Sequence, residues 1–412
     1  MPAPERAYAV WLHERRVGTL LSHGDTTRFV LDPGYAQDPN RVVLGLRFEE
    51  DLGAQHRAHM RLPPWFSNLL PEGRLRQWIA QARGVSEARE MQLLAEVGHD
   101  LPGAVRVTAE SAPVSSATPP AREVVSAGAI AGMAEQIWRF SLAGVGLKFS
   151  MLQQGDRFTA PGVGEGGDWI IKLPDSTYSQ VPLNEYAMMT LARLTGIEVP
   201  EIRRVHRDQL ADVPARLWPS GEDWGYAVKR FDRLADGNRV HLEDLAQVRG
   251  FYPEDKYRGS FETVASLIHR GRDVNSLVEF TRRLAFNILI GNGDAHLKNW
   301  SLRYADPRVP RLSPAYDLVA TAVYRPVEDP ENLGLRFGRS RRFEAVSLAS
   351  FANLQRRLGV DGVVDLPGEV RELVARVEAG WPAVAELLAG ERWLMTGIGE
   401  GIRHQGASLL RG

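Results

Sequence analysis

The first part of the chain alternates hydrophobic and polar positions, which is typical of half-buried strands. Residues 8–12, 16–21, 27–31 and 42–47 follow this period of two or cluster β-forming side chains between Gly, Asp and Pro. The spacing then changes to that of amphipathic helices at 65–70, 73–83 and 87–97. We therefore predict a small β-rich domain that ends in helices.

A second β-rich region follows the clearest linker in the chain. Residues 109–122, AESAPVSSATPPAR, are rich in Ser, Ala and Pro and show no hydrophobic period. Beyond a glycine-rich turn within 139–150, strands are predicted at 168–173 and 225–231. Between these strands, residues 184–194 have strong helical spacing that ends before Gly196 and Pro200.

The last third is mostly helical, with regular spacing in 261–269, 274–289 and 366–389. The whole pattern predicts an α+β protein in which a β-rich part precedes a helical lobe. We place an N-terminal domain at 1–110, a linker at 111–122, a smaller lobe at 123–232 and a helical lobe at 233–412.

Composition narrows the class of protein. The 412 residues are 44% apolar and 25% charged, as in an ordinary globular protein with two or three domains. The net charge of −1 gives no global basic footprint for nucleic acid, and the absence of cysteine excludes disulfides, thiolate metal sites and a cysteine nucleophile. The first residues lack the apolar stretch of a signal peptide, and no apolar run is long enough to span a membrane, so we expect a cytoplasmic protein without membrane contact.

The densest chemistry lies in residues 291–300, GNGDAHLKNW, directly after an apolar run. Asp294 and Asn299 are five positions apart. At this spacing, a kinase aspartate accepts the proton of a substrate hydroxyl and an asparagine binds Mg²⁺. Phosphoryl transfer depends mainly on positioning and on charge around the γ-phosphate, so one polar loop can supply much of it. Two other interpretations of this loop stay open: Asp294 caps a helix, or Asp294 and His296 form a hydrolytic metal site.

Lysine usage indicates the same chemistry. Of the 50 basic residues only five are lysine, at positions 148, 172, 229, 256 and 298. Arginine replaces lysine on most solvated surfaces, but not where a compact point charge must contact a phosphate. Lys148, Lys172 and Lys298 all lie in segments of chemical interest. The alternative is a general drift toward arginine that left five lysines by chance.

Two segments of the smaller lobe suit a nucleotide. SLAGVGLKFS, residues 141–150, contains Gly144 and Gly146, which permit close approach of the backbone to phosphates, although most short glycine-rich turns are only turns. Lys172 lies in an apolar strand, where an unpaired ammonium is costly to bury. Glu185, thirteen residues later near the start of a helix, is a candidate partner. A simple edge-strand lysine is the alternative.

Two further segments complete the set. YAVKRFDR, residues 226–233, is placed to link two lobes and contact adenine through its backbone, or it is a routine strand with solvated charges. Asp317, eighteen residues after Asn299 and beyond a hairpin-like stretch, suits a second Mg²⁺ ligand, or it is an ordinary turn aspartate. Because the order of all five segments matches that of a kinase, we predict a two-lobed protein-kinase-like fold.

With these motifs the chain resembles the HipA family of serine/threonine kinases, which are toxins of bacterial type II toxin–antitoxin pairs. The resemblance covers nearly the whole chain. In the N-terminal half it rests on LPPWFSNLLPEGRLR and LLAEVGHDLPGAVRV, and in the C-terminal half on SLAGVGLKFS, IIKLP, NEYAMM, VKRFDR, HLEDLAQ, GNGDAHLKN and YDLVAT. It implies an ATP- and Mg²⁺-dependent protein kinase and a HipB-like helix-turn-helix antitoxin as partner. It further implies DNA contact mainly through that partner and, as the best-known target, an aminoacyl-tRNA synthetase.

The resemblance also implies roles for matching positions. Asp294 is the expected catalytic base, Asn299 and Asp317 are the expected Mg²⁺ ligands, and Glu185 is the expected partner of Lys172. The residues expected to bind ATP are Ser141, Ala143, Gly144, Val145, Gly146, Lys148, Lys172, Lys229, Phe231, Asp232, His296 and Lys298.

The same resemblance predicts a self-inhibitory mark. Family members phosphorylate a serine of the glycine-rich loop and thereby switch themselves off; the matching position here is Ser141. A phosphate at that position adds nearly two negative charges beside the γ-phosphate site. Gly146 departs from the family pattern, which has glutamine there, and predicts a more mobile loop.

Two other functions remain open from the sequence. D-x-H-x-x-N also resembles the catalytic loop of phosphatidylinositol kinases, so a lipid or small-molecule kinase is one alternative. The other is a weakly active kinase fold that bridges antitoxin dimers on operator DNA. The full-length resemblance favours a protein substrate, and the presence of Lys172, Asp294, Asn299 and Asp317 argues against lost catalysis.

Overall fold

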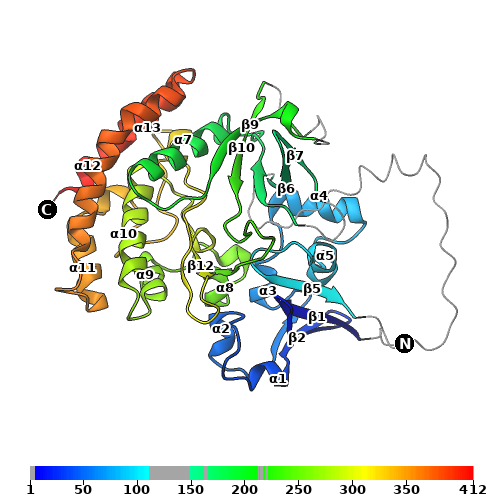
Figure 1. The fold of residues 1–412 in the computed structure, drawn as a ribbon. Coiled ribbons are helices and arrows are strands. Elements are labelled where there is room, and N and C mark those ends of the chain that lie inside the picture. The colour runs from blue at the N-terminus through cyan, green and yellow to red at the C-terminus, as the bar shows by residue number, and fades with distance from the viewer. Residues whose placement is uncertain are drawn as a thin grey trace, which may run out of the picture.

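The computed structural model describes residues 5–110, 148–161, 166–211, 213, 217–218 and 221–411. Over these residues the strands form three antiparallel sheets, and the three longest helices lie in the C-terminal half (Figure 1). An N-terminal domain lies beside a sheet-based small lobe, and a helical large lobe completes the molecule. The predicted α+β, two-lobed arrangement is confirmed.

The N-terminal sheet has the strand order β4-β3-β2-β1-β5. Tyr8, Leu20 and Phe29 are successive cross-strand partners on one buried face, as the period of two predicts. The strands are β1 (Arg6–Leu12), β2 (Arg15–His23), β3 (Thr26–Leu31), β4 (His56–His59) and β5 (Val105–Ala109). The helices are α1 (Pro33–Ala36), α2 (Leu46–Glu49), α3 (Pro64–Ser67), α4 (Gly73–Arg83) and α5 (Glu90–Val97).

The strand predicted at 42–47 is wrong. These residues form a loop that runs into α2, because their backbone groups bond elsewhere than to a neighbouring strand. The N–H of Val43 donates to the carbonyl of Pro307 at 2.9 Å, and the N–H of Leu44 donates to the hydroxyl of Tyr35 at 3.1 Å. The fourth strand is instead the polar segment β4, which carries no apolar alternation to predict it.

The small lobe is a sheet with the order β7-β6-β8-β10-β9, covered by α7. The strands predicted at 168–173 and 225–231 and the helix predicted at 184–194 are found as β8, β10 and α7, with small shifts of their ends. The elements are β6 (Lys148–Gln154), β7 (Arg157–Thr159), β8 (Trp169–Lys172), α7 (Val181–Leu194), β9 (Ile202–His206) and β10 (Trp224–Lys229).

Successive residues of this sheet enter two different cores. Tyr226 and Val228 of β10 pack with α7 and the large lobe, whereas Ala227 between them packs with the N-terminal domain. On β8, Trp169 and Ile171 likewise join the core of the N-terminal domain. Both faces of the sheet are therefore covered, and each fully buried large side chain stabilises the fold by about 2 kcal/mol.

The large lobe begins with β11 and α8 and carries the longest helices. β12 and β13 form an antiparallel hairpin, which confirms the hairpin-like stretch predicted before Asp317. The strands are β11 (His241–Asp244), β12 (Ser301–Tyr304) and β13 (Arg311–Leu312). The helices are α8 (Leu245–Arg249), α9 (Phe261–His269), α10 (Val274–Leu289), α11 (Leu348–Leu358), α12 (Leu366–Ala385) and α13 (Arg392–Leu409).

The helices predicted at 261–269 and 274–289 are confirmed with those bounds. Their starts follow from local chemistry, because Ser260 caps α9 and Asp273 caps α10 through their side-chain oxygens. The helix predicted at 366–389 ends at Ala385, before a 3₁₀ turn. In Figure 1, α11, α12 and α13 form the outer layer on the left, and α10 lies inside them.

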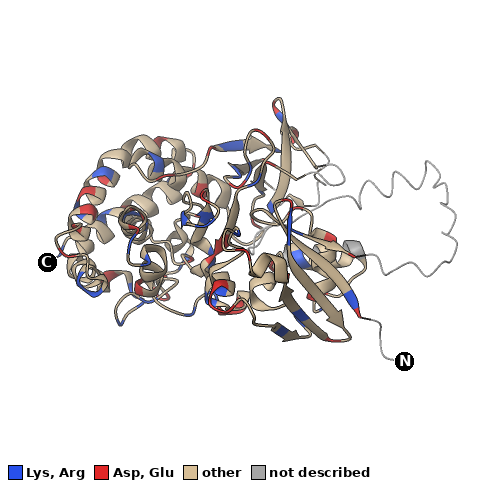
Figure 2. Cartoon of the chain, turned by 60° about the horizontal axis from the view of Figure 1, so that its bottom comes forward, with Lys and Arg blue, Asp and Glu red and all other residues tan. Residues whose placement is uncertain are grey.

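Buried ion pairs join the N-terminal domain to the rest of the chain. Arg230 at the end of β10 is buried and donates to Asp100 at 2.8 Å, to Asp232 at 2.9 Å and to Ser150 at 3.1 Å. Along the ribbon in Figure 2, positions of Lys and Arg are interspersed with those of Asp and Glu. Among the described residues, no helix combines the length and the apolar character that a membrane crossing needs.

Candidate active site

The loop after α10 is folded by its own polar groups. The N–H of Asn292 donates to the carbonyl of Asn287 at 2.8 Å, and the N–H of Asp294 donates to Asn292 Oδ1 at 3.1 Å. Asn299 Nδ2 then donates to the carbonyl of Asp294 at 2.8 Å. Gly291 begins this loop at φ 65°, and a Cβ there would lie 2.7 Å from Ala322. These contacts bring the two ends of the predicted Asp294–Asn299 motif together.

Asp294 is exposed, and its Oδ1 accepts a hydrogen bond from the hydroxyl of Tyr257. Partial desolvation raises the pKa of Asp294, while the Tyr257 hydroxyl lowers it. The helix-cap interpretation of Asp294 finds no support, because the 3₁₀ turn that follows, Leu297–Asn299, has His296 at its cap position.

The hairpin β12–β13 returns the chain to the same place and delivers Asp317. Its backbone has φ 56°, a left-handed conformation that aspartate tolerates better than most residues. Asn292 Nδ2 donates to the carbonyl of Asp317 at 3.3 Å, so the two loops are tied directly.

Lys172 bridges the two lobes. Its Nζ donates to Glu185 Oε1 of α7 at 2.6 Å and also to Asp317 Oδ1. Burial alone would lower the pKa of Lys172, but Asp317 and Glu185 raise it. Burial alone would likewise raise the pKa of Asp317, but Lys172 holds it well below the usual range. The predicted pairing of a strand lysine with a helix glutamate is thus present.

Lys148 is the cross-strand neighbour of Lys172, since β6 and β8 pair Lys148 with Lys172. Burial lowers the pKa of Lys148. The other glycine-rich loop positions assigned to ATP, namely Ser141, Ala143, Gly144, Val145 and Gly146, lie outside the described residues.

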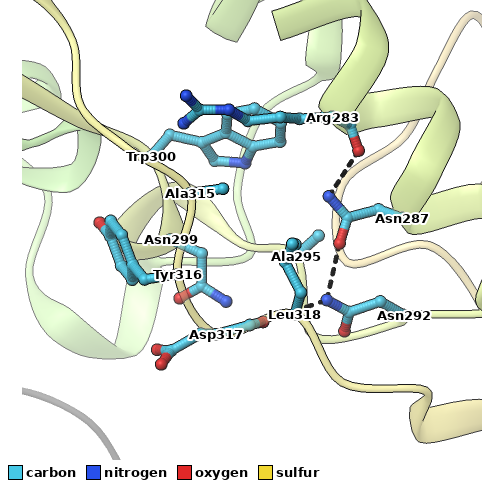
Figure 3. Close-up of a pocket in the computed structure, with 10 residues that line it drawn as sticks. All are labelled: Arg283, Asn287, Asn292, Ala295, Asn299, Trp300, Ala315, Tyr316, Asp317 and Leu318. Atoms are coloured by element: carbon cyan, nitrogen blue, oxygen red, sulfur yellow. Dashed lines mark hydrogen bonds between the residues drawn. The ribbon is translucent and has the colours of Figure 1, made fainter. Parts of the chain in front are cut away.

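A small polar hollow of about 10 Å³ lies behind this cluster (Figure 3). Asn299 and Asp317 lie next to each other on its wall, opposite the hydrogen-bonded pair Asn287 and Asn292. Among the described residues, no three His, Asp or Glu side chains converge on one point. A carboxylate with a neighbouring amide oxygen fits Mg²⁺, which keeps few protein ligands and takes the rest from phosphate and water.

Three of the residues assigned to ATP have other partners here, and a fourth, His296, is buried. Lys298 is buried, and its Nζ lies 2.9 Å from Glu72 Oε1 and 3.0 Å from the carbonyl of Asn68, both in the N-terminal domain. Asp232 accepts from Arg230, Arg233 and the N–H of Gly103. Lys229 is half-exposed with Nζ 3.7 Å from Glu201, and His296 is buried and its pKa is lowered by burial to about 3.

Phe231 lies closer to the cluster, with its ring 5.8 Å from that of Tyr316, which lines the hollow. An ATP contact for Phe231, Lys229, Asp232, His296 and Lys298 stays a prediction. Tyr257 and Glu72 also belong to this site, although no motif in the sequence assigns them a role. Lys256, one of the five lysines, directly precedes Tyr257 and was the sequence signal for this turn. Its bond to Glu72 at 3.0 Å is visible only in the structure.

Comparison with known proteins decides the family. The family model of the HipA-like C-terminal domain matches residues 140–383, and that of the HipA N-terminal domain matches residues 8–108. The chain belongs to the HipA family. The resemblance inferred from the motifs is therefore confirmed.

Bacterial relatives match over most of the chain. "Putative kinase Y4dM" of Sinorhizobium fredii is 42% identical over 391 residues, which are 91% of each protein. The "Serine/threonine-protein kinase toxin HipA" of Shewanella oneidensis is 27% identical over 360 residues, 77% of this chain and 78% of that one. These relatives support a kinase activity.

A solved structure supports the fold. The chain superposes on a structure of the HipA, HipB and operator DNA complex from Shewanella oneidensis with a TM-score of 0.72. Sequence identity is 21%, and the match covers 98% of this chain and 97% of the other. The predicted two-lobed kinase-like fold is confirmed.

Proposed function

We propose that this protein is an ATP- and Mg²⁺-dependent protein serine/threonine kinase and the toxin of a toxin–antitoxin pair. One observation carries the proposal: Lys172, paired with Glu185 at 2.6 Å, also bonds Asp317. Asp317 in turn is tied to the loop of Asp294 and Asn299. The groups that a kinase needs, from four separate segments of the chain, thus lie in one cluster.

Each residue has a role that its contacts allow. Asp294 accepts the proton of the acceptor hydroxyl, because its carboxylate is exposed beside the cluster. Lys172 is held in position by Glu185 and stabilises the phosphates of ATP. Asn299 and Asp317 would hold Mg²⁺, which neutralises phosphate charge when bound. Lys148 adds a second positive charge at the end of the glycine-rich segment.

The glycine-rich segment before Lys148 also carries the proposed regulation by self-phosphorylation. We assign the self-inhibitory phosphorylation to Ser141, seven residues before Lys148. A phosphate there would place negative charge where the γ-phosphate is bound and would weaken ATP binding.

The partners we propose are a HipB-like helix-turn-helix antitoxin and a translation-related protein substrate such as an aminoacyl-tRNA synthetase. The antitoxin is supported by the similar solved structure, the complex of HipA, HipB and operator DNA from Shewanella oneidensis. Contact with DNA is assigned mainly to the antitoxin, and the site of action to the cytoplasm.

The test is incubation of the purified protein with Mg²⁺ and labelled ATP, alone and with a cell extract, beside Asp294→Ala. We expect label on Ser141 and on an extract protein with wild type only. Transfer to lipids or small hydroxyl compounds alone would contradict the protein-kinase proposal. Failure to bind ATP in calorimetry would contradict the enzyme proposal and favour a structural role in an antitoxin complex.

A further inference from the structure

Among the residues that the structure describes, Tyr257 is the one whose side chain donates a hydrogen bond to the carboxylate of Asp294. It lies in the turn between α8 and α9, is 37% exposed, and donates its hydroxyl hydrogen to Asp294 Oδ1. Within the described part of the chain, no donor bonds the other carboxylate oxygen. One oxygen of Asp294 is therefore held, and the other stays open to a substrate.

Tyr257 is itself fixed by the loop that it contacts. Its ring packs edge-to-face on His296, with centroids 5.1 Å apart. The carbonyl before it, that of Lys256, accepts from the N–H of Leu297 at 3.1 Å, and its own carbonyl accepts from Arg341 Nη2 at 2.8 Å. Because His296 and Leu297 belong to the loop of Asp294, the turn and the loop form one unit.

The N-terminal domain fastens this unit from the other side. Glu72 binds Lys256 at 3.0 Å through Oε2 and Lys298 at 2.9 Å through Oε1. Lys256 precedes Tyr257, and Lys298 precedes Asn299. Burial alone would raise the pKa of Glu72, but Lys298 and Lys256 lower it to about 2. The Glu72 carboxylate is therefore ionised at neutral pH.

We infer that Tyr257 is a positioning residue for phosphoryl transfer, holding Oδ1 of Asp294 so that Oδ2 meets the acceptor hydroxyl. The inference rests on the proposed kinase function. In that reaction the acceptor oxygen bonds to the γ-phosphorus of ATP, the bond to the bridging oxygen breaks, and ADP leaves. The hydroxyl proton passes to Oδ2. A free carboxylate rotates, whereas one held at Oδ1 keeps Oδ2 in a fixed direction.

Tyr257→Phe tests this role, because it keeps the ring against His296 and removes only the hydroxyl. Tyr252→Phe is the matched control, since Tyr252 lies in the same turn with its ring 3.8 Å from the guanidinium of Arg61. The measurements are kcat, the KM for ATP and the pH profile of kcat for wild type and both variants.

For Tyr257→Phe we expect kcat to fall about tenfold, the usual effect of losing one hydrogen bond to a charged group, with the KM for ATP unchanged. The acidic limb of the profile should move to higher pH, because the ionised form of Asp294 loses a donor that favours it. Tyr252→Phe should match wild type. An unchanged kcat and acidic limb in Tyr257→Phe would overturn the inference. A raised kcat would also overturn it, by showing that the hydroxyl obstructs the acceptor.

A second readout separates this inference from the proposed function. Titration of ¹³C-labelled aspartate by NMR, with Asp294→Asn to assign the signal, follows the Asp294 carboxylate without any activity. A higher pKa in Tyr257→Phe supports the contact, and an unchanged pKa refutes it. If wild type transferred no phosphate although this pKa shifted, the kinase proposal would fail while the Tyr257 contact stood.

Discussion

Lys148 and Lys172 lie directly opposite each other on the paired strands β6 and β8. Like charges in this position destabilise a sheet. Two carboxylates, those of Glu185 and Asp317, offset them through Lys172. ATP would bring further negative charge to the same place, so the stability of the small lobe is linked to the nucleotide.

Glu185→Gln tests whether the carboxylates offset the positive charge of Lys148 and Lys172. The change keeps the size of the side chain but leaves an excess positive charge, so we expect a loss of a few kcal/mol of unfolding free energy. Mg²⁺ and ATP should raise the Tm of the variant less than that of wild type, because Lys172 loses the partner that holds it toward the phosphates. Thermal unfolding with and without Mg²⁺ and ATP measures both effects. Equal Tm values for the two proteins in the absence of ligand would contradict the argument.

Asp294→Asn should greatly slow phosphoryl transfer without unfolding the protein. Loss of a general base lowers kcat about 10²–10⁴-fold. Because Asp294 is exposed, the free energy of unfolding should change by about 1 kcal/mol or less. Kinase assays and urea unfolding on one preparation provide the measurement. Full activity in this variant would rule out Asp294 as the base.

Arg230→Met should destabilise the seam between the N-terminal domain and the small lobe. Arg230 is 3% exposed, and its removal leaves the carboxylates of Asp100 and Asp232 short of a buried partner. Breaking a buried ion pair on one side costs about 3–5 kcal/mol. Arg207→Met is the control, because its pair with Asp223 is exposed and should change stability by about 0.5 kcal/mol or less. Equal unfolding midpoints for the two variants would refute the assignment.

His241 should make the protein lose stability in mild acid. It is buried between the domains, where Nε2 lies 2.7 Å from the carbonyl of Leu44, and burial lowers its pKa to about 4. Below pH 6.5 the unfolded chain binds a proton that the folded protein does not. Stability is therefore full above pH 6.5 and falls until about pH 4, by up to about 3 kcal/mol.

Urea unfolding of wild type and His241→Gln across this pH range measures the contribution of His241 to the free energy of unfolding. The difference in unfolding free energy between the two proteins should shrink as the pH falls. A difference that stays constant would show that His241 does not titrate in this way.

The sequence predicted the elements that have a strong period and the pairing of Lys172 with Glu185; the roles of the motif residues stay predictions. The strands and helices of regular spacing were found near their predicted bounds, and Lys172 pairs with Glu185 as expected. The strand predicted at 42–47 was wrong because the backbone there bonds to Tyr35 and Pro307. This is a tertiary effect that no local pattern encodes. The partners of Lys298 could not be predicted either, since Asn68 is 230 positions away in the chain.

The contact of Tyr257 with Asp294 could not be predicted from the sequence either. Its position in the sequence, within a polar turn, resembles that of many surface tyrosines. Only the packing of the turn against the loop brings its hydroxyl to Asp294. Contacts between segments that are distant in the chain thus decide which polar residues join a site.

The core of the N-terminal domain includes Trp169 and Ile171 of the small lobe, while Glu72 and Trp65 of the same domain bond Lys298 and Glu243 of the large lobe. The N-terminal domain therefore contacts both lobes and restricts the angle between them. We call these contacts the brace. In the proposed kinase reaction, ADP would then leave through movement of loops instead of a wide opening of the lobes. Substitutions along this brace, far from the reacting atoms, should change the rate of product release more than the rate of chemistry.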